Sequence, residues 1–215
     1  MAPSGAASLA GRALRGASPG AKGLQFVCVM GAATDHITAE QYFLISRVGD
    51  RRQLIDGVMV VNEPRFLHGV VQLRLATALN TWTEGAPGRG RASMPIDVVM
   101  SEHDVYGPDV VWFRAERVPS DWEAEHQEIP DLAVEVRSPG TWRFDTGRKR
   151  DTYESGGLPE LWLVDTQAEV VTAHRRSAPD ADAFDVQLAV GSGERLTSPL
   201  LPGFALDVAK LFARQ

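Results

Sequence analysis

The sequence has 215 residues and a mass of 23.4 kDa, a length that fits one folded domain with or without a tail. It is 44% hydrophobic and 23% charged, as average soluble globular proteins are, which excludes a chain that is disordered throughout. The formal net charge of −6 argues against a protein that coats nucleic acid nonspecifically, although an enzyme with a local basic groove remains compatible with it. No run approaches the roughly 18 apolar residues that a membrane-spanning helix needs.

Residues 1–34 differ in composition from the rest of the chain. Residues 1–23 are almost entirely Ala, Gly, Ser, Pro and a few bases without apolar periodicity, so we expect a disordered segment. Alternatively, translation starts at Met30 and residues 1–34 are a mis-assigned tail. The apolar run 24–30 resembles a secretory signal only faintly, and the single cysteine, Cys28, fits a reducing compartment, so we expect a cytoplasmic protein. One domain is expected over residues 35–215.

Helix and strand signals alternate from residue 35 onward. Thr38 and Gln41 have the pattern of a capping box before an apolar helical side. A hairpin is predicted over 53–61 around Asp56-Gly57. Helices are predicted over 68–84 and 142–155, and strands over 91–100, 109–113, 132–137, 161–165, 170–175 and 184–190. This order predicts an α/β (α+β) fold, a mixed central sheet flanked by helices with additional C-terminal strands.

Two acids lie within apolar strand patterns. Asp109 opens the predicted strand 109–113, and Glu135 lies deep inside the strand 132–137. An ionised side chain buried there costs several kcal/mol unless it is paired or binds a metal. Carboxylates on neighbouring strands, with a backbone carbonyl and waters, are suitable ligands for Mg²⁺. In a plainer interpretation, Glu135 pairs with Arg137 or Lys149, or its strand lies at an edge.

The helix predicted over 142–155 carries Asp145, Lys149 and Tyr153 on one face, at intervals of four residues. One interpretation is a solvated face with an ordinary ion pair between Asp145 and Lys149. In the other, Lys149 reaches back across the turn 138–141 and stabilises negative charge at the metal site. The second interpretation predicts that the Lys149 amine lies within about 6 Å of a Glu135 carboxylate oxygen. Asp145 is then expected to face solvent or a basic neighbour.

The order and spacing of several motifs resemble the Uma2-like restriction endonuclease family of the PD-(D/E)XK nuclease superfamily. The resemblance covers about residues 38–207 of the chain. The matching residues are Leu54-Ile55-Asp56-Gly57, His68, 108–111, 130–136, Ser138-Pro139, Lys149 with Tyr153, and 157–165.

This resemblance implies a restriction-endonuclease-like core that hydrolyses DNA phosphodiester bonds. It implies that Asp109 and Glu135 bind Mg²⁺, with Mn²⁺ as a substitute. The superfamily's usual lysine, two positions after the acid, is Arg137 here, and arginine stays protonated and is a poor general base. As in relatives whose lysine lies on the helix, the role passes to Lys149. Candidates for contacts to the substrate or to the metal ligands are His68, Asp56, Arg137 and Tyr153.

Two other classes of function stay open at this point. A noncatalytic DNA-binding or protein-interaction module would keep the same fold, and a small α/β protein would use the two acids as a structural pair. The presence of Asp109, Glu135 and Lys149 together favours the enzyme. Cleavage of both DNA strands generally needs two active sites, so we expect a homodimer, with the apolar segment 161–164 and the later strands as contact surfaces. Neither a membrane nor another obligatory protein partner is expected.

Overall fold

The computed structural model describes residues 36–47, 49 and 51–214. The predictions of a disordered or mis-assigned tail over residues 1–34 lie outside these residues and stay predictions, as does the boundary at residue 35. Within the described ranges, no helix is both long and apolar enough to span a bilayer.

Four short strands between residues 52 and 106 form an antiparallel sheet in the order β2-β1-β5-β4. They are β1 (Arg52–Ile55), β2 (Val58–Val61), β4 (Val98–Ser101) and β5 (Asp104–Tyr106). The predicted hairpin is confirmed, because Asp56 and Gly57 both have positive φ angles, 51° and 70°, as a tight two-residue turn requires. Helix α1 (Ala39–Ile45) has the predicted capping box and packs on this sheet through Tyr42.

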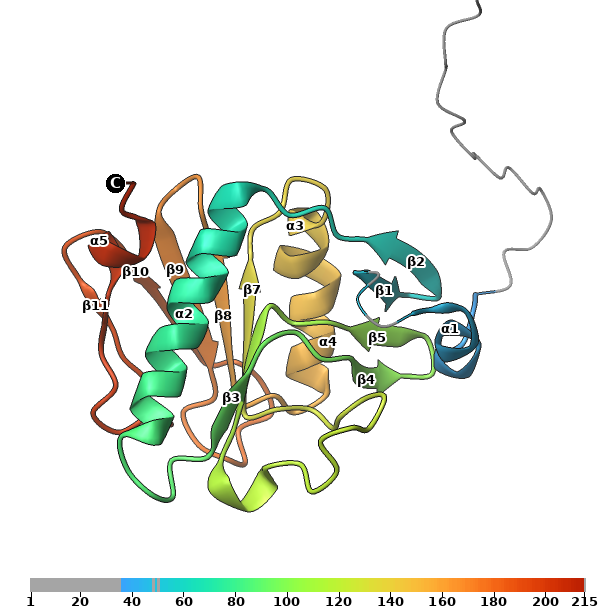
Figure 1. Cartoon of the computed structure of the whole chain (residues 1–215), viewed down its shortest axis with the longest axis horizontal. Coiled ribbons are helices and arrows are strands. Elements are labelled where there is room, and N and C mark those ends of the chain that lie inside the picture. The colour runs from blue at the N-terminus through green and yellow to red at the C-terminus, as the bar shows by residue number, and fades with distance from the viewer. Residues whose placement is uncertain (1–35, 48, 50, 215) are drawn as a thin grey trace, which may run out of the picture. The chain divides into compact units, whose positions relative to one another are not determined.

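A larger, six-stranded sheet has the order β10-β9-β8-β7-β6-β3 (Figure 1). Its strands are β3 (Arg91–Ser93), β6 (Val110–Phe113), β7 (Leu132–Val136), β8 (Glu160–Asp165), β9 (Val170–Arg175) and β10 (Val186–Val190). Strands β7 and β8 run parallel, whereas the other neighbours in this sheet pair antiparallel. The sheet is therefore mixed, as the sequence predicts.

Helices cover the two faces of the six-stranded sheet. Helix α2 (Phe66–Glu84) lies on one face (Figure 1). The opposite face is covered by the crossover between β7 and β8, which consists of α3 (Trp142–Phe144), a segment kinked at Gly147 (Asp145–Lys149) and α4 (Arg150–Ser155). The fold is thus a mixed α/β arrangement with flanking helices.

Residues of β7 alternate between two hydrophobic cores, as a period of two predicts. One face of the strand packs against α2, with Leu132, Val134 and Val136 in the same cluster as Val71 and Leu75. The other face packs against the crossover, with Ala133 in the same cluster as Tyr153. Because Glu135 shares the face of Ala133, its side chain is directed towards the crossover.

Short strands account for most differences from the sequence-based prediction. The strand predicted over 91–100 is two strands, β3 and β4, in different sheets, because Pro95 lies between them and cannot donate a ladder hydrogen bond. Three further strands and a helix are not predicted: β5, β11 (Arg195–Leu196), β12 (Leu206–Asp207) and α5 (Val208–Phe212).

The interpretation of segment 161–164 as a contact surface is wrong. These residues belong to β8, which lies between β7 and β9, and their side chains are buried within the protein. A second copy of the chain cannot reach them without unfolding the sheet.

Candidate active site

Asp109 and Glu135 come together on neighbouring strands. The antiparallel register pairs Val110 with Val134, so Asp109, immediately before β6, lies beside Glu135 of β7. The backbone N–H of Val136 donates to Oδ2 of Asp109 over 2.7 Å. Both carboxylates are buried. The two residues predicted to bind metal therefore belong to one cluster.

Lys149 approaches this cluster from the crossover. Its Nζ lies 2.7 Å from Oε1 of Glu135 and 3.0 Å from Oδ1 of Asp145, well inside the predicted 6 Å. Asp145 faces the basic neighbour that the sequence analysis expects, but it is buried. Asp145 and Lys149 both belong to the segment between α3 and α4, which is kinked at Gly147. One turn later, the Tyr153 hydroxyl donates to Oε1 of Glu135 over 2.8 Å.

His68 contacts the cluster at Asp109. Its Nε2 lies 3.0 Å from Oδ1 of Asp109, and its Nδ1 lies 3.1 Å from Oγ of Ser138. An ionised carboxylate only accepts hydrogen bonds, so Nε2 carries the proton, and a neutral ring then accepts from Ser138 at Nδ1. Burial works to lower the His68 pKa, but the hydrogen bond and charge of Asp109, together with backbone hydrogen bonds of Arg137 and Val136, outweigh it and raise that pKa. His68 is thus placed to orient Asp109.

The cluster contains more buried acid than base. Burial, reinforced by the carboxylates of Asp145 and Asp109 and opposed by Lys149, raises the pKa of Glu135 to about 8. Burial also raises the pKa of Asp145 despite the ion pair with Lys149. For Lys149, burial alone lowers the pKa, but the two carboxylates outweigh it and raise the pKa above its usual value. Lys149 therefore remains protonated at neutral pH.

This charge balance fits a hard divalent cation bound by Asp109 and Glu135. Two buried carboxylates contact the Lys149 ammonium group and a third, that of Asp109, lies beside Glu135, so a bound cation would stabilise the ionised form of Glu135 that burial disfavours. Among residues 36–47, 49 and 51–214, no group of three or more His, Cys, Asp or Glu side chains is arranged to hold a metal. Backbone carbonyls and waters are therefore needed to complete the ligand set.

Two of the predicted site residues have other partners. The Arg137 guanidinium pairs with Asp165 over 2.8 Å and lies over the Trp142 ring. Asp56 lies at the hairpin turn, where its carboxylate is largely exposed and pairs with Arg148 over 3.2 Å. Arg137 thus pairs with Asp165, whereas Lys149 contacts Glu135.

Tyr106 and Ser138 belong to the cluster, but the sequence analysis gives neither of them a role. The Tyr106 ring lies 5.4 Å from Nζ of Lys149 and packs edge-on against Tyr153. Tyr106 lies in a three-residue strand, too short to show a periodic pattern. The signal for Ser138 is its place in the Ser138-Pro139 motif directly after the strand that carries Glu135.

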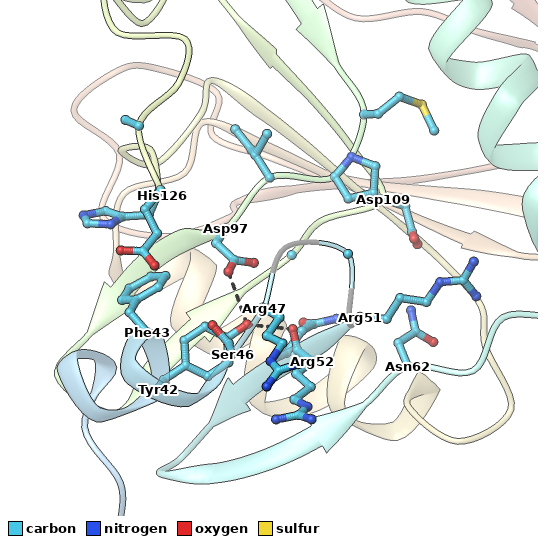
Figure 2. A pocket seen from close by; sticks show the side chains of 18 of the residues that line it. Tyr42, Phe43, Ser46, Arg47, Arg51, Arg52, Asn62, Asp97, Asp109 and His126 are labelled. Atoms are coloured by element: carbon cyan, nitrogen blue, oxygen red, sulfur yellow. Dashed lines mark hydrogen bonds between the residues drawn. The ribbon is translucent and has the colours of Figure 1, made fainter.

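A cleft of about 980 Å³ opens beside this cluster (Figure 2). Asp109 and His68 line it at the cluster, and Gln72 of α2 lines it next to them. The rest of its wall comes from α1 and the segment between α1 and β1, from β1, from Asn62 and Pro64 after β2, from Gly107, and from the loops around residues 94–97 and 122–126. The cleft therefore gives a ligand access to Asp109.

The mixed sheet, with two acids on adjacent strands and a lysine on the crossover, defines a nuclease-like fold. A crystal structure described as "a putative nuclease belonging to DUF820 from Anabaena variabilis" has the same fold, with a TM-score of 0.68 at 17% identity. The similarity covers 82% of this chain and 97% of that chain.

The family model Uma2, described as "Putative restriction endonuclease", matches residues 39–209. The chain belongs to this family. The comparison with curated proteins yields no match.

Proposed function

We propose that this protein is a Mg²⁺-dependent endonuclease that hydrolyses DNA phosphodiester bonds. The observation that carries the proposal is the contact between Lys149 and Glu135 beside Asp109, at the edge of an accessible cleft. Membership of a family described as restriction endonucleases supports the same conclusion.

In this proposal each residue of the cluster has a distinct task. Asp109 and Glu135 hold Mg²⁺, which polarises a phosphodiester and lowers the pKa of an attacking water when bound. Lys149 stays protonated and places positive charge where negative charge develops on the phosphate, an effect that is strongest in a site shielded from water. His68 fixes the orientation of Asp109, and Tyr153 fixes that of Glu135.

The second candidate is a noncatalytic DNA-binding or protein-interaction module that retains the nuclease fold. It is favoured by the burial of Lys149, whose side chain is only 1% exposed and contacts two carboxylates. Such a buried group of charges can serve the fold alone. The two candidates therefore differ in whether the cluster binds metal and turns over substrate.

A nicking assay separates the candidates. Supercoiled plasmid is incubated with the protein in Mg²⁺, Mn²⁺ or EDTA, and Asp109→Asn and Glu135→Gln are compared with wild type. We expect metal-dependent nicking that each substitution lowers by at least about a hundredfold, because both remove an interaction with the catalytic ion. Glu160→Gln is the matched control, since Glu160 is equally buried but lies outside the cluster.

Calorimetry with Mn²⁺ tests the same residues without turnover. We expect Asp109→Asn and Glu135→Gln to abolish the Mn²⁺ binding that Glu160→Gln retains. Absence of metal-dependent nicking on duplex DNA, single-stranded DNA and RNA contradicts the enzyme. Unchanged Mn²⁺ affinity in both variants contradicts the site.

A homodimer is part of the proposal, because two copies of the site are needed to cut both strands of a duplex. The buried segment 161–164 does not contribute to its interface. Light scattering on a dilution series tests the dimer, and a strict monomer at micromolar concentration contradicts it.

A further inference from the structure

We propose that the cleft beside Asp109 binds a single unpaired nucleotide of the DNA substrate. This inference rests on the proposed function and adds the form of DNA that the site accepts. Three groups of residues on the cleft wall support it: two amide residues with unpaired oxygens, aromatic residues and arginines.

Two residues of the cleft wall each carry an amide oxygen that is buried behind the surface and has no hydrogen-bond partner among the residues that the structure describes. These oxygens are Oε1 of Gln53 and Oδ1 of Asn62. Gln53 as a whole is only 6% exposed. A buried acceptor without a donor costs free energy, which a ligand with an N–H group recovers once the amide turns toward the cleft. Nucleobases offer such donors on their exocyclic amino groups and ring nitrogens.

Aromatic side chains form the side of the cleft opposite Asp109. Phe43 and His126 lie stacked, with ring centroids 5.0 Å apart and planes at 26° (Figure 2). Trp122 also lines the cleft and is 72% exposed, unusual for so large an apolar side chain. Such rings are platforms on which bases stack without regard to sequence.

Arginines lie between these aromatic rings and Asp109. Arg47, Arg51 and Arg52 line the cleft, as Figure 2 shows. Guanidinium groups match the geometry and charge of phosphate. The acids Glu123 and Glu125 lie on the loop that carries Trp122 and His126. They repel phosphate and accept from base N–H groups, so the phosphate faces the arginines and the base faces the aromatic rings.

The cleft accepts a base only when that base has left its pair. A base within a duplex has its hydrogen-bonding edge occupied and both faces stacked, so it cannot reach Gln53 or the aromatic rings. The volume of about 980 Å³ accommodates an extruded or single-stranded nucleotide beside Asp109. The site therefore prefers single-stranded or locally unpaired DNA to a continuous duplex, and each copy of the site in a dimer would take an unpaired nucleotide from one strand of an opened duplex.

A binding experiment with the full chain in EDTA tests this, because no cleavage can occur there. The probe is a single-stranded DNA heptamer with 2-aminopurine at its centre, compared with the same strand annealed to its complement. We expect the single strand to bind at least about tenfold more tightly and its fluorescence to be quenched by stacking.

Phe43→Ala should weaken binding of the single strand by about tenfold, the loss of one stacking platform. Leu44→Ala is the matched control, because Leu44 is the next residue of α1, is 80% exposed and does not line the cleft. Gln53→Met, which keeps the side-chain length but removes the acceptor, should weaken binding severalfold without lowering the melting temperature of the free protein.

Equal affinity for single strand and duplex, or equal effects of Phe43→Ala and Leu44→Ala, overturns the inference. Failure of the inference is distinct from failure of the proposed function. Metal-dependent nicking with no Phe43-dependent binding leaves the nuclease and removes the nucleotide site. Phe43-dependent binding without nicking leaves the nucleotide site and removes the nuclease.

Discussion

Glu135 and Glu160 are buried glutamates on the adjacent parallel strands β7 and β8. Burial raises the pKa of both. Glu160 accepts from the Trp162 indole and the Ser198 hydroxyl, each over 2.6 Å, and pairs with Arg175. Its partners are donors, and they tie the C-terminal segment to the sheet.

Glu135 differs because acids lie among its neighbours. Lys149 and Tyr153 contact its Oε1, but the charges of Asp145 and Asp109 act against its ionisation. Two glutamates with similar burial thus have opposite surroundings. The partners of Glu160 oppose the effect of burial on its pKa, whereas Asp145 and Asp109 add to that effect at Glu135, where a bound cation would offset it. Burial of an acid alone does not identify a functional residue; the balance of its partners does.

The largest difference in stability between the two glutamate sites is expected when the basic side chain that pairs with each glutamate is removed. Lys149→Met leaves two buried carboxylates without their ammonium group and should lower the free energy of unfolding by about 3–5 kcal/mol at neutral pH. Arg175→Met should cost about half as much, because Glu160 keeps its hydrogen bonds to Ser198 and Trp162. Urea unfolding measures both variants in EDTA.

Titration of each glutamate gives the second test. The Glu135 pKa is about 8 in the folded protein against an ordinary 4.5, so the folded state holds a proton that the unfolded state has lost. Stability from this group is present at low pH and is lost as pH rises from about 4.5 to about 8. In metal-free protein, the free energy of unfolding of Glu135→Gln should therefore rise relative to that of wild type by roughly 1–3 kcal/mol as the pH increases from about 5 to about 8.5.

Glu160→Gln provides the contrast in the same titration. It removes charge-assisted hydrogen bonds from Ser198 and Trp162 and should destabilise the protein by about 1–3 kcal/mol. Melting curves recorded at each pH measure the stability of wild type and both variants, which is then plotted against pH. Parallel curves for wild type and Glu135→Gln over this range contradict a raised Glu135 pKa.

The smallest difference is expected at the hydroxyl groups. Tyr153→Phe removes one hydrogen bond to Glu135 and should cost about 1 kcal/mol at about pH 8.5, and less at about pH 6, where the acid is protonated. Ser198→Ala removes one hydrogen bond to Glu160 and is the matched control. A Tyr153→Phe effect that does not change with pH shows that this hydroxyl does not sense the charge of Glu135.

Local pattern predicts the main elements of this fold. The capping box at Thr38, the turn at Asp56-Gly57 and the alternation around Glu135 depend on neighbouring residues, and each is present. The division of 91–100 between two sheets and the pairing of β5 depend on strands far away in sequence. Three-residue strands have too few positions to show a period of two.

The candidate site divides in the same way. The spacing of Asp145, Lys149 and Tyr153 predicts a shared helical face, and the structure places that face on Glu135. The partner of Arg137 is not predictable, because Asp165 reaches it only through the pairing of β7 with β8. The cleft is not predictable from local sequence patterns either, because its wall comes from segments as far apart in the sequence as Phe43 and His126.

The crossover between β7 and β8 links assembly of the site to assembly of the sheet. Parallel strands cannot be joined by a tight turn, so the chain between β7 and β8 has to cross the face of the sheet before it enters β8. Lys149 lies in the middle of that crossover. The connection that makes the parallel pair possible is therefore also the segment that places the ammonium group against Glu135. In Lys149→Met the crossover must close over uncompensated acids, so refolding should slow as well as stability fall.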